Sequence, residues 1–248
     1  PLLKVIVADV PSLSSKFAHT TGVVQISARD PEAEGGKSAT YFVIEQGVWT
    51  VFNDQVSPSP DVELEFKSIP AMNAFFKGKM IPLPAMHGMF SHFSLFLHFM
   101  QALLKMSGLL GAKEPPKSLE DRKLMVKCFF YLLTSGISQL NKLGHPEVLA
   151  WSKNSPDRVY ALAIENEPDV AAYIRIKAGK SRAGRGKYTR ALPFFTLSFD
   201  SFDSALGILL GTDDMIASTK SGKLIMDGAP EFGATFGNLL LAVGGYVQ

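Results

Sequence analysis

Cysteine is scarce in this sequence, and neither sign of charge dominates it. The 248 residues include one cysteine, Cys128, which cannot form an internal disulfide, and the aromatic residues after it predict a buried thiol in an apolar setting. Twenty-five basic and 23 acidic residues leave a formal net charge of +2. A nearly neutral chain has no general affinity for polyanions, so contact with nucleic acid or a membrane would need a local basic patch.

The sequence also lacks the short motifs of common catalytic and metal sites. It has no GxSxG nucleophile motif, no paired-carboxylate signature, and no HExxH or cysteine-pair spacing around its five histidines. We therefore expect no catalytic residue, no metal ion and no cofactor, and we expect that the protein is not an enzyme.

No segment reads as an export signal or a clear membrane span. Residues 1–8 have no long apolar core before a small-residue cleavage site, so we expect no signal peptide and a cytoplasmic location. Residues 89–110 are long and apolar enough to span a bilayer, but two histidines, Gln101 and Lys105 interrupt them. The apolar residues recur at helical spacing, which predicts an amphipathic core helix. This stripe consists of Phe93, Phe96, Leu97, Met100, Leu103 and Leu104.

Apolar residues are abundant, and they take part in an internal repeat. Hydrophobic residues make up 46% of the chain, with 18 phenylalanines and nine methionines, which suits a roomy apolar interior. Residues 64–78 match residues 197–211 at a constant offset of 133. Each copy predicts an alternating strand, a capping residue and a short helix that ends at glycine. The identical pairs are Leu64 and Leu197, Phe66 and Phe199, Ser68 and Ser201, and Gly78 and Gly211.

The repeat extends outward in both directions. Two further strands are expected before each copy, and a strand with a final apolar helix after it. They fall at 23–27, 40–44, 86–90 and 93–105 in the first copy, and at 159–164, 172–176, 222–228 and 232–243 in the second. This order predicts a duplicated α+β fold, in which an antiparallel sheet is covered by helices on one face.

A proline-rich charged stretch, residues 111–118, separates the two copies. It places a divergent N-terminal repeat at 1–111 and a C-terminal repeat at 118–248. The C-terminal repeat is expected to open with a helix over 119–143, capped by Ser118, and a short helical turn at 146–151.

The order of these elements resembles the sterol carrier protein 2 family of lipid-binding domains. The family has a strand, a short helix ending in a glycine-containing turn, and a GKLxIxG-like strand before an apolar helix. Similar elements here are residues 195–199 (FTLSF), 204–211, 222–228 (GKLIMDG) and 232–243. The N-terminal copy departs from this pattern, because only 21 residues precede its first strand and its later strand is reduced to MHGMF.

The resemblance implies a five-stranded sheet covered by helices, enclosing an apolar tunnel for a fatty acid, a fatty acyl-CoA or a sterol-like lipid. Family members carry or present lipids and need no catalytic residues. The resemblance and the apolar stripes together nominate the walls of such a cavity. The nominated residues are Phe93, Phe96, Met100, Phe199, Leu206, Leu209, Phe232, Phe236 and Leu240.

A basic, glycine-rich stretch at 177–190 is the sharpest local feature. It holds six cations, and no acid occurs from Val170 to Phe199. One interpretation is a solvated hairpin loop; another is that Arg182, Arg185 and Lys187 bind a lipid headgroup, an acyl-CoA phosphate or an anionic membrane surface in transient contact. We do not expect nucleic acid as a partner. Proteins that bind it usually stack several aromatic side chains on the bases, and Tyr188 is the one aromatic residue in this basic stretch.

Two other classes of function stay open at this point. The two copies could form a structural or interaction module whose aromatic residues simply fill the core, or an enzyme that holds an acyl substrate. The sequence does not specify the lipid, the number of binding copies or the oligomeric state.

Overall fold

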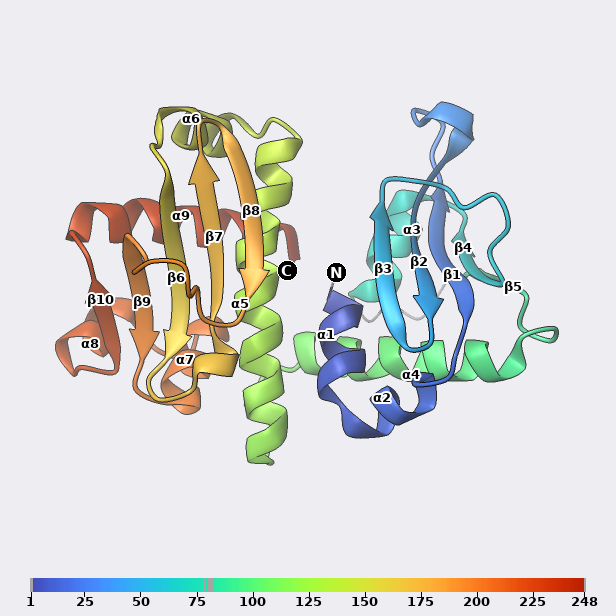
Figure 1. The fold of residues 1–248 in the computed structure, drawn as a ribbon, viewed down its shortest axis with the longest axis horizontal. Helices are drawn as coiled ribbons and strands as arrows, with labels where there is room; N and C mark the ends of the chain where they lie inside the picture. The colour runs from blue at the N-terminus through green and yellow to red at the C-terminus, as the bar shows by residue number, and fades with distance from the viewer. Residues whose placement is uncertain (1, 78, 80–82, 248) are drawn as a thin grey trace. The chain divides into compact units, whose positions relative to one another are not determined.

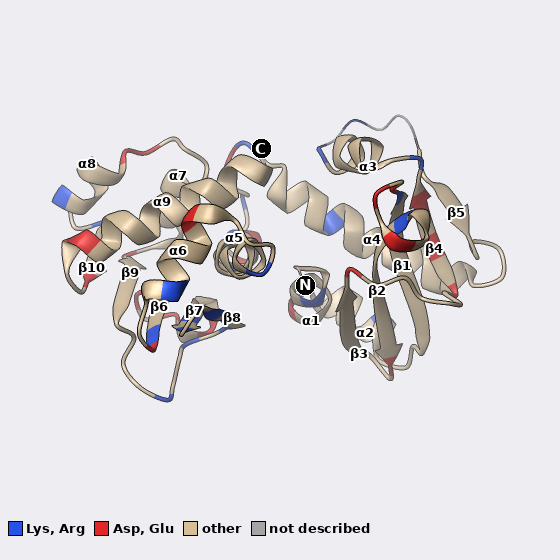
Figure 2. Ribbon diagram, turned by 90° about the horizontal axis from the view of Figure 1, so that it is seen from above, with Lys and Arg blue, Asp and Glu red and all other residues tan. Residues whose placement is uncertain are grey.

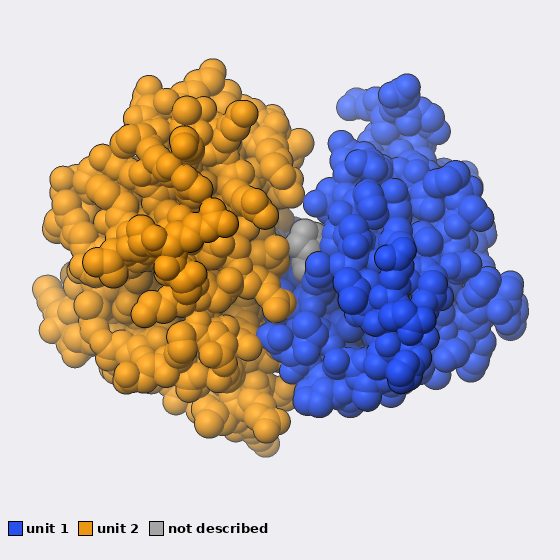
Figure 3. Space-filling view, viewed as in Figure 1, with its two compact units in different colours: residues 1–111 blue, residues 112–248 orange. Residues whose placement is uncertain are grey.

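The chain forms two compact units, described from a computed structural model that covers residues 2–77, 79 and 83–247. Unit 1 comprises residues 1–111 and unit 2 residues 112–248 (Figure 3). The division falls at the start of the proline-rich stretch. Gly78, expected to end the first of the two repeated short helices, lies outside the described residues.

Unit 1 is a mixed sheet with helices before and after it (Figure 1). Two short helices, α1 (Leu2–Asp9) and α2 (Pro11–Phe17), precede its first strand. The sheet has the order β3-β2-β1-β4-β5. Its elements are β1 (Gly22–Arg29), β2 (Lys37–Glu45), β3 (Val48–Asn53), β4 (Val62–Phe66), α3 (Ile69–Phe76), β5 (Ala85–His87) and α4 (Phe93–Leu110), with a 3-10 turn at Glu34–Gly36.

Unit 2 also contains a five-stranded sheet, of order β10-β9-β6-β7-β8. Figure 2 shows its helices on one side of this sheet. Helix α5 begins after Ser118, whose hydroxyl accepts from the amide of Asp121, so the predicted cap is confirmed. The elements are α5 (Leu119–Lys142), α6 (Pro146–Asn154), β6 (Arg158–Ile164), a 3-10 turn at Pro168–Val170, β7 (Ala172–Lys177), β8 (Lys180–Arg185), β9 (Phe195–Phe199), α7 (Phe202–Leu209), α8 (Met215–Lys220), β10 (Leu224–Asp227) and α9 (Pro230–Val247).

The two sheets have the same strand order and the same directions. In each, three strands form an antiparallel meander, and the chain then crosses back to place a fourth strand beside the first. That crossing makes β1 parallel to β4 and β6 parallel to β9. The prediction of a purely antiparallel sheet is therefore wrong for the central pair, because the alternating pattern of a strand does not record its direction.

Each meander ends in a strand that was not expected, β3 or β8, which a tight hairpin turn joins to the strand before it. Gln46 and Gly47 join β2 to β3, and Ala178 and Gly179 join β7 to β8, all four with positive φ. Two left-handed residues make the type I′ turn that matches the twist of a tight hairpin, and glycine adopts this conformation at little cost. Strand β8 therefore occupies residues 180–185 of the stretch that was expected as a loop at 177–190.

The short helix after the fourth strand begins in the same way in both units. The Ser68 hydroxyl accepts from the amide of Ala71 at the start of α3, and the Ser201 hydroxyl accepts from the amide of Ser204 at the start of α7. The serines of the repeat are thus N-caps, as expected.

Candidate functional site

The nominated residues of unit 2 lie on three elements around one apolar layer. Helix α5 packs against β7, α7 and α9, while α7 and α9 pack against β9. Phe199, Leu206 and Phe236 are buried, at 4%, 0% and 0% exposure, whereas Leu209, Phe232 and Leu240 are half-buried. The sheet and helices therefore enclose Phe199, Leu206 and Phe236.

Aromatic rings that were not nominated complete this layer. Phe130 of α5 stacks on Phe199, with ring centroids 5.9 Å apart. Tyr160 of β6 lies 5.3 Å from the ring of Phe236, which also meets Phe195 of β9 at 6.4 Å. Strand alternation could have identified Tyr160 and Phe195, because both occupy the same face of adjacent parallel strands.

The nominated residues of unit 1 do not form its core. Helix α4 buries Leu95, Phe99, Ala102, Leu103 and Leu109. Phe93 is 60% exposed, while Phe96 and Met100 are half-buried. The predicted stripe is wrong for Phe93, Leu97 and Leu104, because α4 packs on α1 and α2 through a neighbouring set of positions that spacing alone does not select.

Helix α4 is long and apolar enough, by length and composition, to cross a membrane. Its 18 residues have a mean hydropathy of 1.3, and a third of them are buried within the protein. A core helix of a water-soluble domain passes the same test.

The basic residues do not form one cluster. Strand alternation places Arg182 on the open face of the sheet with Tyr173, and Arg185 on the helix-covered face. Arg182, Arg185 and Lys187 are exposed. Beside Arg182, Arg175 binds Asp157 through two hydrogen bonds of 2.8 and 2.6 Å, which lowers the pKa of Asp157 to about 2.

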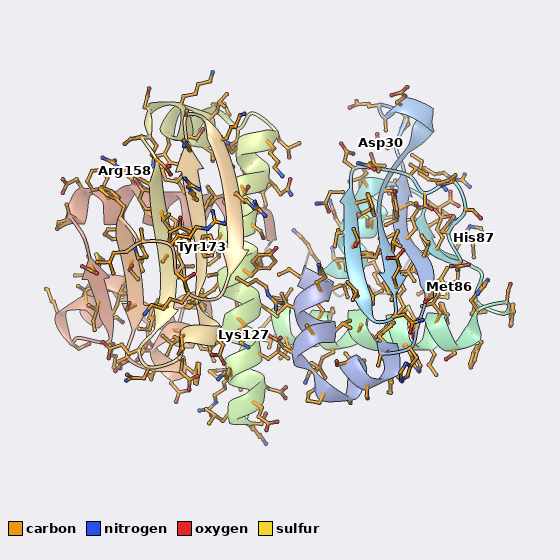
Figure 4. The ribbon with its side chains drawn as sticks, viewed as in Figure 1. Asp30, Met86, His87, Lys127, Arg158 and Tyr173 are labelled. Atoms are coloured by element: carbon orange, nitrogen blue, oxygen red, sulfur yellow. The ribbon has the colours of Figure 1, made fainter. Side chains whose placement is uncertain are left out.

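A cation that was not nominated lies on the helix-covered side of the sheet. Arg158 is the first residue of β6 (Figure 4). It alternates with Tyr160 along the strand and so lies on the same face as the apolar layer. Its guanidinium carbon lies 3.9 Å from the ring centroid of Phe194 and 4.8 Å from that of Phe232. The two rings meet edge to face at 4.7 Å, and Phe194 meets Tyr160 at 5.8 Å.

Unit 1 instead concentrates polar groups on the face of its sheet opposite to Leu64 and Phe66. The buried Glu63 Oε1 accepts from Ser27 Oγ at 2.5 Å, Gln25 Nε2 at 2.8 Å and Lys37 Nζ at 3.0 Å. Burial raises the pKa of Glu63, but the bonds from Ser27, Lys37 and Gln25 outweigh it, so the pKa lies below its usual value. The carboxylate is therefore charged at neutral pH.

A neighbouring carboxylate extends this network. Glu65 pairs with His87 at 3.0 Å and with Arg29 at 3.3 Å, and Lys37 lies 3.7 Å from it. Glu63, Glu65 and His87 could together offer three ligand atoms to a metal ion. Lys37 and Arg29 already balance the two carboxylates, however, and a lysine ammonium at this position disfavours a second cation.

Comparison with known proteins assigns no family. No family model and no curated protein matches this sequence. One similar solved structure is the solution structure of a conserved hypothetical protein from Thermus thermophilus, named as a possible sterol carrier protein. It is 16% identical over 47% of this chain and 83% of that chain, with a TM-score of 0.31. A likeness at this score does not establish a shared fold.

Proposed function

We propose that this protein binds a lipid in unit 2, between the sheet and helices α5, α7 and α9, and carries or presents it without chemical change. The candidate ligands are a fatty acid, a fatty acyl-CoA and a sterol-like lipid. The observation that supports this function is the gathering of Phe199, Leu206 and Phe236 with three further rings in one apolar layer. Apolar walls with few polar groups suit a lipid.

Helix α9 has a composition that would let a ligand enter this layer. It contains four glycines, and each glycine inside a helix costs about 1 kcal/mol relative to alanine. A side chain at Gly233 would meet the ring of Phe195 at 2.8 Å, so packing explains this glycine. At Gly237, Gly244 and Gly245 a methyl group would meet no atom within 4 Å. These three weaken the helix without improving its packing, which favours its displacement by a ligand.

We also propose that the two units arose by duplication and that only unit 2 binds lipid. The common strand order, the paired hairpin turns and the paired serine caps support duplication. Helix α4 buries a face other than the one that holds the nominated residues, so its packing does not support an equivalent site in unit 1. A cytoplasmic location and transient contact of exposed cations with an anionic membrane belong to the same proposal.

The direct test is native mass spectrometry of the full chain, followed by organic extraction of anything bound. A second test titrates the protein with N-phenyl-1-naphthylamine, an uncharged apolar fluorophore. We expect stoichiometric lipid or saturable fluorophore binding. An empty protein that binds neither the fluorophore nor oleate would overturn the proposal and favour a structural module, while turnover of palmitoyl-CoA would favour an enzyme.

Two adjacent leucines on α9 provide a matched pair of variants. Leu240 is half-buried beside the apolar layer, whereas Leu241 is 70% exposed. We expect Leu240→Glu to weaken fluorophore binding by about tenfold or more, because it introduces a charge into an apolar site, and Leu241→Glu to leave it unchanged. If Leu240→Glu does not fold, Leu240→Asn serves as the milder change. Equal affinity of all variants would place the ligand elsewhere.

A further inference from the structure

The corner formed by Arg158, Phe194 and Phe232 holds a cation without an acidic partner. Arg29, Arg122 and Arg175 each pair with a carboxylate. Arg158 makes no ion pair with any described residue, and its guanidinium contacts the rings of Phe194 and Phe232. Glu231 lies next to Phe232 in sequence, but it is exposed and makes no ion pair with Arg158 within the described parts of the chain.

The rings fix the guanidinium while leaving its hydrogen-bond donors available. Cation–π contacts use the flat faces of the group, whereas its N–H donors project from the edges in the plane. A planar fork of this kind matches the two oxygens of a carboxylate or phosphate. Because Arg158 is half-buried and already held in place, an anion would find this fork ordered before it binds.

The corner is also continuous with the apolar layer. Phe194 and Phe232 are partly exposed, Phe194 touches Tyr160, and Tyr160 touches Phe236. Tyr160 and Phe236 are 1% and 0% exposed. A molecule with an anionic head at Arg158 would therefore have its apolar tail directed along rings that lead into the interior.

The equivalent corner of unit 1 has the opposite charge. The amide of Asp61 donates to Val23 O at 2.9 Å, and the amide of Phe194 donates to Val159 O at 2.8 Å, so these two residues occupy the same place in their sheets. The Asp61 carboxylate accepts from the amide of Val23 at 2.7 Å and lies 3.6 Å from His92. Gly22 stands where unit 2 has Arg158. An acid at this corner would repel an anion.

We propose that Arg158 is the anchor for the anionic headgroup, a carboxylate or a phosphate, of an amphiphile whose tail enters the apolar layer of unit 2. This inference rests on the proposed function and narrows its ligand to a charged lipid. It assigns the headgroup to Arg158, in place of Arg182, Arg185 and Lys187.

The test measures displacement of N-phenyl-1-naphthylamine by three ligands with the same tail: dodecanoate, dodecyl phosphate and dodecanol. We expect Arg158→Gln to weaken both anions by about tenfold or more, as for loss of a charged hydrogen bond, and dodecanol by less than about twofold. Arg158→Lys keeps the positive charge and the apolar stem but loses the planar fork. Its affinity for the two anions should lie between that of the wild-type protein and that of Arg158→Gln. Arg182→Gln is the matched control, because it removes an exposed arginine from the same sheet.

The outcomes separate this inference from the proposed function. An equal loss for all three ligands would give Arg158 a structural role only and overturn the anchor, as would unchanged binding of the anions. If the wild-type protein does not bind the fluorophore or dodecanol, the lipid function itself fails and the anchor fails with it. A preference between dodecanoate and dodecyl phosphate would distinguish a fatty acid from a phosphorylated lipid.

Discussion

The two sheets differ on the face opposite to the apolar residues of their fourth strands, at positions that the strand registers make equivalent. Unit 1 has Glu63 and Glu65 on its fourth strand, where unit 2 has Thr196 and Ser198. On the first strand, Gln25 and Ser27 of unit 1 correspond to Ala161 and Ala163 of unit 2. The same backbone pattern thus supports an ionic network in one unit and small neutral side chains in the other.

This difference shows that two sheets with the same strand order can carry side chains of different chemistry. Backbone hydrogen bonds fix where the side chains stand, and the side chains decide what each face and corner can bind. Unit 1 places a buried ionic network on this face and an acid at its corner. Unit 2 has small neutral side chains at the equivalent positions and places the half-buried Arg158 on the helix-covered side.

The largest effect is expected from Glu63→Leu. This change leaves Ser27, Gln25 and Lys37 without their acceptor, so we expect unit 1 to lose about 3–5 kcal/mol of its free energy of unfolding. Thr196→Ala at the equivalent position should change unit 2 by less than about 0.5 kcal/mol, as is usual for surface substitutions.

The chain provides a separate fluorescent reporter for each unit. Its two tryptophans are Trp49, in unit 1, and Trp151, in unit 2. Denaturant unfolding of a Trp151→Phe background reports unit 1, and that of a Trp49→Phe background reports unit 2. A loss of less than about 1 kcal/mol in unit 1, the net value of an ordinary hydrogen bond, would contradict a role for the network in stability.

A second, smaller effect is expected from acid. The pKa values of Glu63 and Glu65 are lowered in the folded state, so their stabilisation is complete above the ordinary value of 4.5 and is lost as the pH falls through the lowered values. Asp157 of unit 2 has a pKa of about 2 against an ordinary value of 3.8, so its effect begins at lower pH. Trp49 fluorescence during acid titration should therefore change at higher pH than Trp151 fluorescence. The reverse order would contradict the comparison.

The serine caps should affect both units alike. Ser68→Ala and Ser201→Ala each remove one side-chain acceptor from a helix N-terminus, at a cost of about 1 kcal/mol. The two single-tryptophan backgrounds measure the two losses separately. If the two losses in free energy of unfolding differ by more than about twofold, the repeated helices do not contribute equally to the stability of their units.

The smallest effect is expected from alanine substitutions in α9. Gly237→Ala should stabilise unit 2 by about 0.5–1 kcal/mol, because the helix gains propensity and the new methyl group meets no atom. Gly233→Ala should destabilise unit 2, since its methyl group would meet the ring of Phe195. Under the proposed function, stopped-flow release of N-phenyl-1-naphthylamine should also be slower in Gly237→Ala. Faster release would contradict displacement of this helix.

The sequence predicts much of the fold through local patterns. Alternation predicts the strands around Leu64 and Leu197, and the repeated serines predict the starts of the helices that follow. Direction and pairing depend on partners that are distant in sequence, so the parallel central pair and the face of α4 that packs on α1 and α2 were not predictable. Strands β3 and β8 were missed because their alternating faces are not consistently apolar.

Less of the candidate site than of the fold could be predicted from the sequence. Phe199, Leu206 and Phe236 could be nominated from repeat position and helical spacing. Arg158 could not, because its partners Phe194 and Phe232 come from two other parts of the chain. The basic composition of residues 177–190 instead favoured a headgroup site there. Strand β8 places Arg182 and Arg185 on opposite faces of the sheet.

The cations of β8 have a consequence that concerns other copies of the chain. Strand β8 is the outermost strand at one end of its sheet, and unpaired backbone groups of an outermost strand can recruit a strand from a second molecule. Lys180, Arg182 and Arg185 place three like charges along this edge, so two copies that approach edge to edge repel each other. These residues therefore disfavour edge-to-edge association of the protein at high concentration.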